Sequence, residues 1–205
     1  GSVLGYGSMH DAARRLDALF RERGVAPGEV VGFMLPTGIA AATAFVGSMA
    51  AGRIVTPFNL LAQDAHLDYI VGHATPRLVF AGSKFAARVR EAVARAGTRT
   101  EVIETGTGAL ELPAAPSARL PEPRGEVTAM LMYTSGTTGL PKGVLLSHAN
   151  MLHAGSSVAR HHGLGRYDRV LSSLPLYHIN GQCSAMVSAM VAGASAILPR
   201  RFSTQ

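Results

Sequence analysis

Residues 133–143 bring together, in one short stretch, the kinds of group that bind phosphate. They read Tyr-Thr-Ser-Gly-Thr-Thr-Gly-Leu-Pro-Lys-Gly and follow an apolar run. Glycine lets a backbone turn tightly and bring its N–H groups close to an anion, while hydroxyl and ammonium groups donate hydrogen bonds to phosphate oxygens. The side-chain donors are Thr134, Ser135, Thr137, Thr138 and Lys142. The composition therefore predicts a cradle for a polyphosphate.

This stretch differs from the common nucleotide-binding loop, in which Gly-Lys-Ser/Thr opens a helix. Pro141 precedes Lys142 and supplies no N–H, and residues 144–146 are apolar as in a strand. We therefore expect a loop between two strands, so that no helix dipole holds the phosphates. The alternative is a plain glycine-rich hairpin turn. Hairpin loops usually contain two to five residues, and this one is about twice as long.

His178 is the second candidate for chemistry. It follows a predicted buried strand, residues 169–174, and the ligand sites of open α/β sheets lie at the carboxyl ends of strands. The alternative is a histidine that bonds to a loop carbonyl, and the residues alone leave both open. The other histidines lack the i, i+4 spacing of a helical zinc site, and we interpret them as surface or helix-end residues. Ser147 is expected to cap a helix, and Cys183 to be a small buried residue.

The elements around these residues alternate between strand and helix. This alternation predicts a three-layer αβα fold of the α/β class, with a mainly parallel sheet and helices on both faces. Ser83 is expected to cap the fourth helix. Helices are expected at residues 11–23, 38–51, 63–73, 83–96, 147–161 and 181–191, and strands at 30–35, 54–56, 78–80, 101–103, 128–133, 143–146, 169–174 and 195–198.

The alternation is interrupted once, by a stretch rich in glycine and proline. Residues 105–126 are predicted to be a linker between the first α/β units, residues 1–104, and a phosphate-loop unit, residues 127–205. We expect all three to be parts of one larger domain.

The composition and charge of the chain indicate which kinds of binding partner to expect. The 205 residues are 47% hydrophobic and 16% charged, as in a globular protein, and carry a net charge of +6. The arginines are scattered and aromatic residues make up only 6%, so we expect no nucleic-acid partner. The longest nearly apolar stretch, residues 186–199, is shorter than the roughly 18 residues of a membrane-spanning helix. The first residues do not read as a signal peptide, and a single cysteine excludes an internal disulfide.

Tyr133–Gly143 resembles the phosphate-loop signature of the adenylate-forming superfamily, which comprises acyl- and aryl-CoA synthetases, luciferases and peptide-synthetase adenylation domains. Residues 144–150, Val-Leu-Leu-Ser-His-Ala-Asn, continue it as the family usually does. Residues 174–181, Leu-Pro-Leu-Tyr-His-Ile-Asn-Gly, resemble the acyl-CoA synthetase version of the next motif, which favours CoA ligases over peptide-synthetase domains. The resemblance covers essentially the whole chain.

The resemblance implies a two-step reaction with ATP, Mg²⁺ and CoA. A carboxylate attacks the α-phosphate of ATP and releases pyrophosphate, and the acyl-adenylate then passes its acyl group to the thiol of CoA. His178 would lie beside the acyl carboxylate and Gly181 near the pocket wall, while a hydroxyl of Thr137 or Thr138 would contact Mg²⁺. The residues that would bind the β- and γ-phosphates are Thr134, Ser135, Gly136, Thr137, Thr138, Gly139 and Lys142.

The resemblance also leaves several elements unmatched. The adenine- and metal-contacting acidic segment, the ribose-binding aspartate, the hinge and the small C-terminal domain with its adenylation lysine have no counterpart before Gln205. We therefore expect the N-terminal portion of the large AMP-binding domain of a cytoplasmic acyl-CoA synthetase, inactive as an isolated chain. The alternatives are a non-catalytic piece that binds phosphate or pairs with a partner, an aryl-CoA ligase and a luciferase-like enzyme. Fatty acid metabolism is one expected setting, but fatty, aromatic and small polar acids all stay open, as does the oligomeric state.

Overall fold

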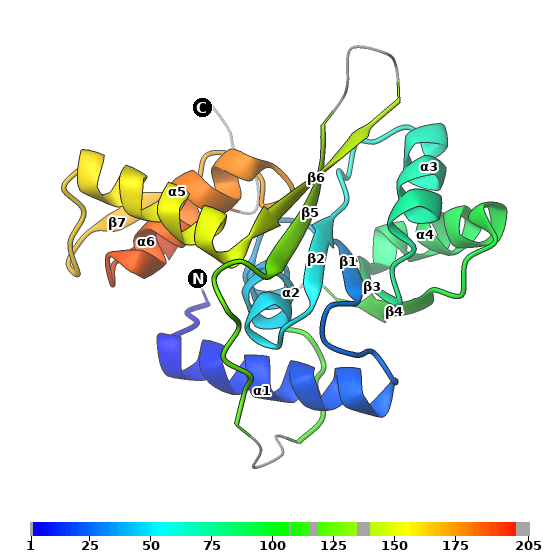
Figure 1. Cartoon of the computed structure of the whole chain (residues 1–205), viewed down its shortest axis with the longest axis horizontal. Coiled ribbons are helices and arrows are strands. Elements are labelled where there is room, and N and C mark those ends of the chain that lie inside the picture. The colour runs from blue at the N-terminus through cyan, green and yellow to red at the C-terminus, as the bar shows by residue number, and fades with distance from the viewer. Residues whose placement is uncertain (1, 107, 115–118, 135–139, 200–205) are drawn as a thin grey trace.

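The computed structural model describes residues 2–106, 108–114, 119–134 and 140–199 (Figure 1). Strands and helices alternate along the chain, as the sequence predicts. The strands are β1 Val30–Met34, β2 Ile54–Pro57, β3 Leu78–Gly82, β4 Glu101–Thr105, β5 Thr128–Thr134, β6 Lys142–Ser147, β7 Arg169–Leu171 and β8 Ser195–Ile197. The helices are α1 Tyr6–Glu22, α2 Ile39–Ala50, α3 Asp64–Ala74, α4 Ser83–Ala96, α5 His148–His161 and α6 Ser188–Val191, with a π-helix, η1, at Asn180–Val187.

A mainly parallel sheet forms the centre of the molecule. Its six strands lie in the order β4-β3-β1-β2-β5-β6. All neighbouring pairs are parallel except β5 and β6, which run antiparallel and leave β6 at one edge. The predicted α/β fold with a mainly parallel sheet is therefore confirmed. The short strands β7 and β8 form a separate parallel pair outside this sheet.

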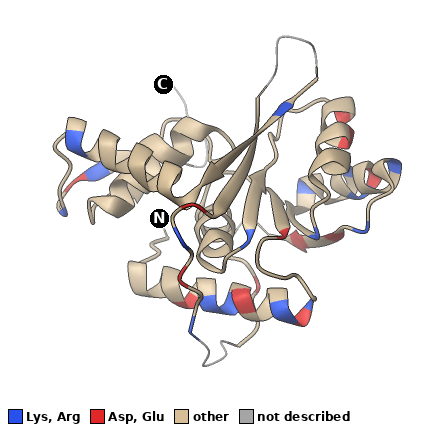
Figure 2. Ribbon diagram, viewed as in Figure 1, with Lys and Arg blue, Asp and Glu red and all other residues tan. Residues whose placement is uncertain are grey.

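Two apolar clusters cover the two faces of the sheet. One contains side chains of α1, α2 and α5, and the other contains side chains of α3 and α4. Figure 1 shows α3 and α4 on the other side of the sheet from α1 and α2. The central strands β1 and β3 contribute to both clusters, which explains their nearly continuous apolar sequences. Ion pairs from Arg88 to Asp64 and from Arg95 to Asp68 join α4 to α3. Figure 2 shows that basic and acidic residues are interleaved along these helices and α1.

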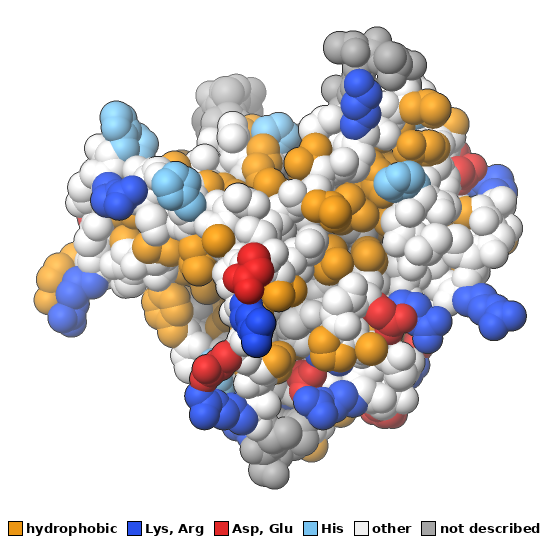
Figure 3. All heavy atoms as spheres, viewed as in Figure 1, with side chains coloured by type: hydrophobic (Ala, Val, Ile, Leu, Met, Phe, Trp, Pro, Cys, Tyr) orange, Lys and Arg blue, Asp and Glu red, His pale blue; other side chains and the backbone are white. Residues whose placement is uncertain are grey.

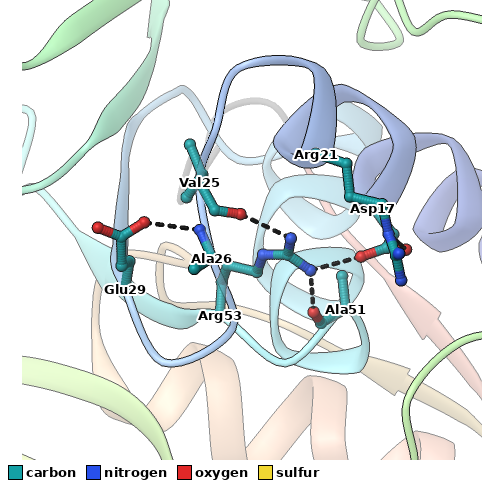
Figure 4. A network of polar contacts seen from close by, with 7 residues as sticks. All are labelled: Asp17, Arg21, Val25, Ala26, Glu29, Ala51 and Arg53. Atoms are coloured by element: carbon teal, nitrogen blue, oxygen red, sulfur yellow. Dashed lines mark hydrogen bonds and ion pairs between the residues drawn. The ribbon is translucent and has the colours of Figure 1, made fainter.

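A buried arginine ties α1 to the start of β2 (Figure 4). The Arg53 side chain is 1% exposed, and its guanidinium donates to the Asp17 carboxylate at 2.5 Å and to the Val25 carbonyl at 2.7 Å. It also donates to the Ala51 carbonyl and lies over the Phe20 ring, 5.0 Å from the ring centroid. Burial lowers the pKa of Arg53 from its usual value, and the hydrogen bond and charge of Asp17 oppose that shift. These contacts lie at the amino-terminal end of the parallel strands, opposite their carboxyl ends.

One helix start and one helix cap differ from the prediction. Helix α1 begins at Tyr6 rather than at residue 11, and the Tyr6 hydroxyl donates to the Ala194 carbonyl at 2.6 Å. The polar residues at the start of α1 hid this extra turn from the sequence pattern. Ser83 does not cap α4: the cap position is Gly82, and the Ser83 hydroxyl instead donates to the Thr105 carbonyl at 3.4 Å.

The glycine- and proline-rich stretch between β4 and β5 contains no helix or strand in its described residues, 106, 108–114 and 119–127. Leu110 is nevertheless buried in the cluster that contains α1 and α2. The division into residues 1–104, 105–126 and 127–205 stays a prediction. No helix in the described part of the chain is long and apolar enough to cross a membrane.

Candidate functional site

The candidate phosphate loop connects the two antiparallel strands β5 and β6. Thr134 ends β5, Lys142 begins β6, and these two residues are paired across the hairpin. The predicted strand–loop–strand arrangement is confirmed, and Lys142 lies in a strand rather than in a helix. The other predicted phosphate ligands, Ser135, Gly136, Thr137, Thr138 and Gly139, lie outside the described residues, as do the proposed metal contacts among them.

Lys142 is exposed and makes no ion pair or hydrogen bond with any other described side chain. Thr134, directly opposite, is exposed as well. An ammonium group without an acidic partner, beside a hydroxyl donor, is suited to bind an anion. Figure 3 shows hydrophobic side chains gathered over β5 and β6, where Val144 and Leu145 of the edge strand are 42% and 63% exposed.

His178 does not lie at the carboxyl end of a buried strand, so this prediction is wrong. Strand β7 stops at Leu171, pairs with β8 and is largely exposed. Directly after β7, the Ser172 hydroxyl donates to the Leu174 carbonyl at 2.9 Å. The exposed His178 side chain follows in a loop, where its Nδ1 accepts a hydrogen bond from the Asn180 N–H at 3.3 Å. Nε2 is therefore the ring nitrogen left to meet a ligand.

The loop that carries His178 is nevertheless held at the carboxyl edge of the main sheet. Leu176 is buried, and its N–H donates to the hydroxyl of Thr37 at 3.2 Å, just after β1. Its carbonyl accepts from Gln182 Nε2 at 2.6 Å. Because β1, β2 and β5 run parallel, this anchor lies at the same edge as Thr134, two strands away, or roughly 10 Å at ordinary strand spacing. The structure thus brings both candidate groups to one edge.

Gly181 packs directly beneath the His178 loop. A Cβ added at Gly181 would lie 2.4 Å from the Pro175 carbonyl oxygen and 2.6 Å from that of Leu174. No side chain fits there, so glycine is required for the loop to approach the helix. Among the described residues, no hydrogen bond or ion pair joins His178 or Gly181 to Thr134 or Lys142.

The helix after His178 differs from the predicted α-helix at residues 181–191. It is a π-helix at Asn180–Val187, followed by a short α-helix, Ser188–Val191. Its wider turn places the side chain of Gln182, which is 0% exposed, against the His178 loop. An apolar helical pattern cannot distinguish the two helix types. Sequence reasoning missed Gln182 and Thr37, because neither residue stands out from the small and polar residues beside it.

Three other residues that could act as nucleophiles or metal ligands, Cys183, Ser147 and His148, are instead buried or placed at the start of a helix. Cys183 is buried, as predicted, with its sulfur 3.7 Å from that of Met151, and burial raises the pKa of the thiol to about 11. Ser147 caps α5 by accepting from the Asn150 N–H, as predicted. His148 begins α5 half-buried, and burial lowers its pKa. The described residues contain no group of three or more potential metal ligands.

A hollow of about 150 Å³ lies away from these residues. Side chains of α1, β3 and β4, of residues 110–111 and of Arg23, which directly follows α1, line it. None of the predicted site residues contributes to it.

Comparison with known proteins shows the family of the chain. The AMP-binding enzyme family matches residues 1–205. Sulfoacetate–CoA ligase from Cupriavidus necator is 43% identical over 208 residues, which cover 99% of this chain and 41% of the relative. 4-Coumarate–CoA ligase 5 from Oryza sativa is 32% identical, with 100% and 39% coverage. The chain thus spans about two fifths of the length of these relatives.

Solved structures give the same result for the fold. The ATP-bound structure of MatB from Rhodopseudomonas palustris superposes with a TM-score of 0.89 at 23% identity, covering 99% of this chain and 41% of that one. A benzoate CoA ligase from Burkholderia xenovorans has a TM-score of 0.82 at 26% identity, with 94% and 39% coverage. Fold, loop position and family match all agree with the resemblance seen in residues 133–143. The chain belongs to the AMP-binding enzyme family.

Proposed function

We propose that this chain supplies the phosphate-binding part of an AMP-forming acid–CoA ligase. In the proposed reaction a carboxylate oxygen attacks the α-phosphorus of ATP, the bond to the β-phosphate oxygen breaks and pyrophosphate leaves. The CoA sulfur then attacks the acyl carbon, and AMP departs. The observation that supports this most directly is the position of the Thr134–Lys142 pair and the His178 loop at one edge of the sheet.

In this proposal Lys142 stabilises the charge that develops as pyrophosphate separates. Thr134, with Ser135, Gly136, Thr137, Thr138 and Gly139, binds the β- and γ-phosphates. The Nε2 of His178 donates to the bound carboxylate or adenylate, and Gly181 leaves room for the loop at the pocket wall. Mg²⁺ enters with ATP as part of the substrate, and a hydroxyl of Thr137 or Thr138 contacts it.

The class of acid stays broad. The names of the relatives include sulfoacetate, 4-coumarate and long-chain fatty acids, which share only the carboxylate. Fatty acid metabolism is therefore one possible setting among several for the proposed enzyme. Because its cosubstrates are ATP and CoA, we propose that it acts in the cytoplasm.

The two lysines of the chain allow a direct test of the phosphate site. The 205-residue chain is treated with an amine-acylating reagent with and without MgATP or magnesium pyrophosphate, and peptide mass spectrometry measures the labelling of Lys142 and Lys84. Both side chains are exposed, and Lys84 lies on α4, so it is the internal control. We expect the ligands to slow labelling of Lys142 several-fold and to leave Lys84 unchanged. Equal labelling of Lys142 with and without ligand would contradict the proposal.

A further inference from the structure

A histidine of α3 contacts the hairpin immediately below the candidate phosphate loop. His73 lies in the last turn of α3, and its Nδ1 is 2.6 Å from the hydroxyl oxygen of Tyr133. The two rings meet edge to face, with centroids 5.7 Å apart. Tyr133 directly precedes Thr134 on β5 and is paired with Gly143 on β6. The hydrogen bond therefore reaches the hairpin at the residue before Thr134, the last residue of β5.

The imidazole also packs against the second strand of the hairpin. A Cβ added at Gly143 would lie 3.4 Å from His73 Cε1 and 3.5 Å from Tyr133 Cε1. Tyr69, one turn earlier on α3, stacks on His73 with ring centroids 5.7 Å apart and ring planes at 20°. Burial raises the pKa of Tyr133 to about 12, so its hydroxyl stays protonated at neutral pH and can donate to Nδ1. The contact thus combines packing with a directed hydrogen bond.

The hairpin needs such support because it extends beyond the sheet. The parallel register between β2 and β5 is defined at Val55 and Met130, and β2 ends two residues later at Pro57, which has no N–H to donate. Beyond the end of β2, residues 133–134 and 142–143 continue as a two-stranded ribbon (Figure 1). A ribbon of two strands is only marginally stable alone. Helix α3, by contrast, is anchored by two ion pairs to α4.

We infer that His73 is a positioning residue, which through Tyr133 fixes the end of the β5–β6 ribbon and thereby the direction of Thr134 and Lys142. This role rests on the proposed function of the loop as a phosphate site. His73 itself need not touch the phosphates. Its imidazole joins the anchored helix to the protruding strands at the residue pair next to Thr134 and Lys142.

Hydrogen exchange on the 205-residue chain tests the positioning role directly. His73→Phe keeps an aromatic ring but removes the hydrogen bond, and Tyr133→Phe removes it from the other side. In either variant, we expect the amide hydrogens of residues 131–134 and 142–145 to exchange about two- to tenfold faster than in the parent chain. The double variant should exchange them little faster than either single variant. His73→Asn, which places an amide near the position of Nδ1, should restore slow exchange. His66→Phe, on the same helix but without a described hydrogen bond, is the matched control.

The same variants are then compared in MgATP binding. We expect His73→Phe and Tyr133→Phe to weaken MgATP binding about two- to tenfold, and His73→Asn to bind MgATP nearly as well as the parent chain. The melting temperature of the variants should be unchanged. Unchanged exchange in His73→Phe would overturn the inference, as would faster exchange with unchanged affinity. The two proposals fail separately, because labelling of Lys142 that ignores MgATP contradicts the phosphate site whatever the exchange rates are.

Discussion

At the scale of single residues, Lys142 is the side chain on which the proposed chemistry depends most. It can be tested in a chimera in which this chain replaces the matching two fifths of the C. necator ligase. Lys142→Ala removes one charge-assisted contact, worth about 1.5–3 kcal/mol, and should slow adenylate formation roughly ten- to hundredfold. Thiolysis of supplied acyl-adenylate requires no pyrophosphate contact and should be nearly unchanged. Lys84→Ala is the control, and an equal loss in both half-reactions would indicate a structural role for Lys142.

Gly181 allows a prediction about the loop that carries His178. Gly181→Ala would force a methyl group onto two backbone oxygens, so we expect a loss of about 2–3 kcal/mol in the free energy of unfolding. The control is Gly7→Ala in α1, where a Cβ meets nothing within 4 Å and should stabilise the helix by about 0.5–1 kcal/mol. Urea denaturation measures both. A Gly181→Ala chain as stable as the parent would show that the loop can move away from the helix.

The buried thiol of Cys183 should react slowly in the folded chain. With a pKa of about 11, roughly one thiol in a thousand is ionised at pH 8, whereas at the ordinary value of 9.0 about one in ten is. We expect reaction with a thiol-specific disulfide reagent to be about a hundredfold slower in the native chain than in guanidinium. The native rate should rise about tenfold per pH unit up to pH 10. Rapid reaction of the native chain at pH 8 would exclude a buried thiol.

At the scale of elements, the buried ion pair between Asp17 of α1 and Arg53 is the contact between α1 and the sheet whose loss should lower stability most. Asp17→Ala leaves a buried guanidinium without its carboxylate, so we expect unfolding to cost about 3–5 kcal/mol less. Asp11→Ala, on the same helix, removes an exposed carboxylate 3.9 Å from Arg14 and should change stability by no more than about 0.5 kcal/mol. Thermal unfolding of the two variants makes the comparison, and equal effects would contradict this account of the network.

Helices and strands could be predicted from the sequence where the pattern of apolar residues directly indicates burial. The continuous apolar runs of β1 and β3 predict buried strands, and the apolar residues 144–146 predict a strand after the phosphate loop. The site was less predictable, because its supports are contacts between distant segments. Thr37 meets Leu176 across 139 residues of sequence, and His73 meets Tyr133 across 60. Neither contact leaves a periodic pattern.

At the scale of the whole molecule, the chain spans about two fifths of the length of its relatives, and its activity should reflect this. We expect the purified 205-residue chain to form no acyl-CoA, because the proposed site supplies phosphate-binding groups without completing the reaction geometry, and positioning contributes several kcal/mol to such reactions. A coupled assay for AMP release, with the C. necator chimera as positive control, measures this. Acyl-CoA formation at the rate of the chimera would contradict the prediction.

The strand order also determines how the protein can assemble during its synthesis. Strands β1 to β4 lie within the first 105 residues, so their ladders can close before β5 leaves the ribosome. The exposed side of β2 then remains open until β5 arrives and pairs at Val55. Strands β5 and β6, joined by a local loop, can form their antiparallel ladder on that side quickly. The segment with the candidate phosphate site is thus translated last among the six strands, and it docks on a sheet that already exists.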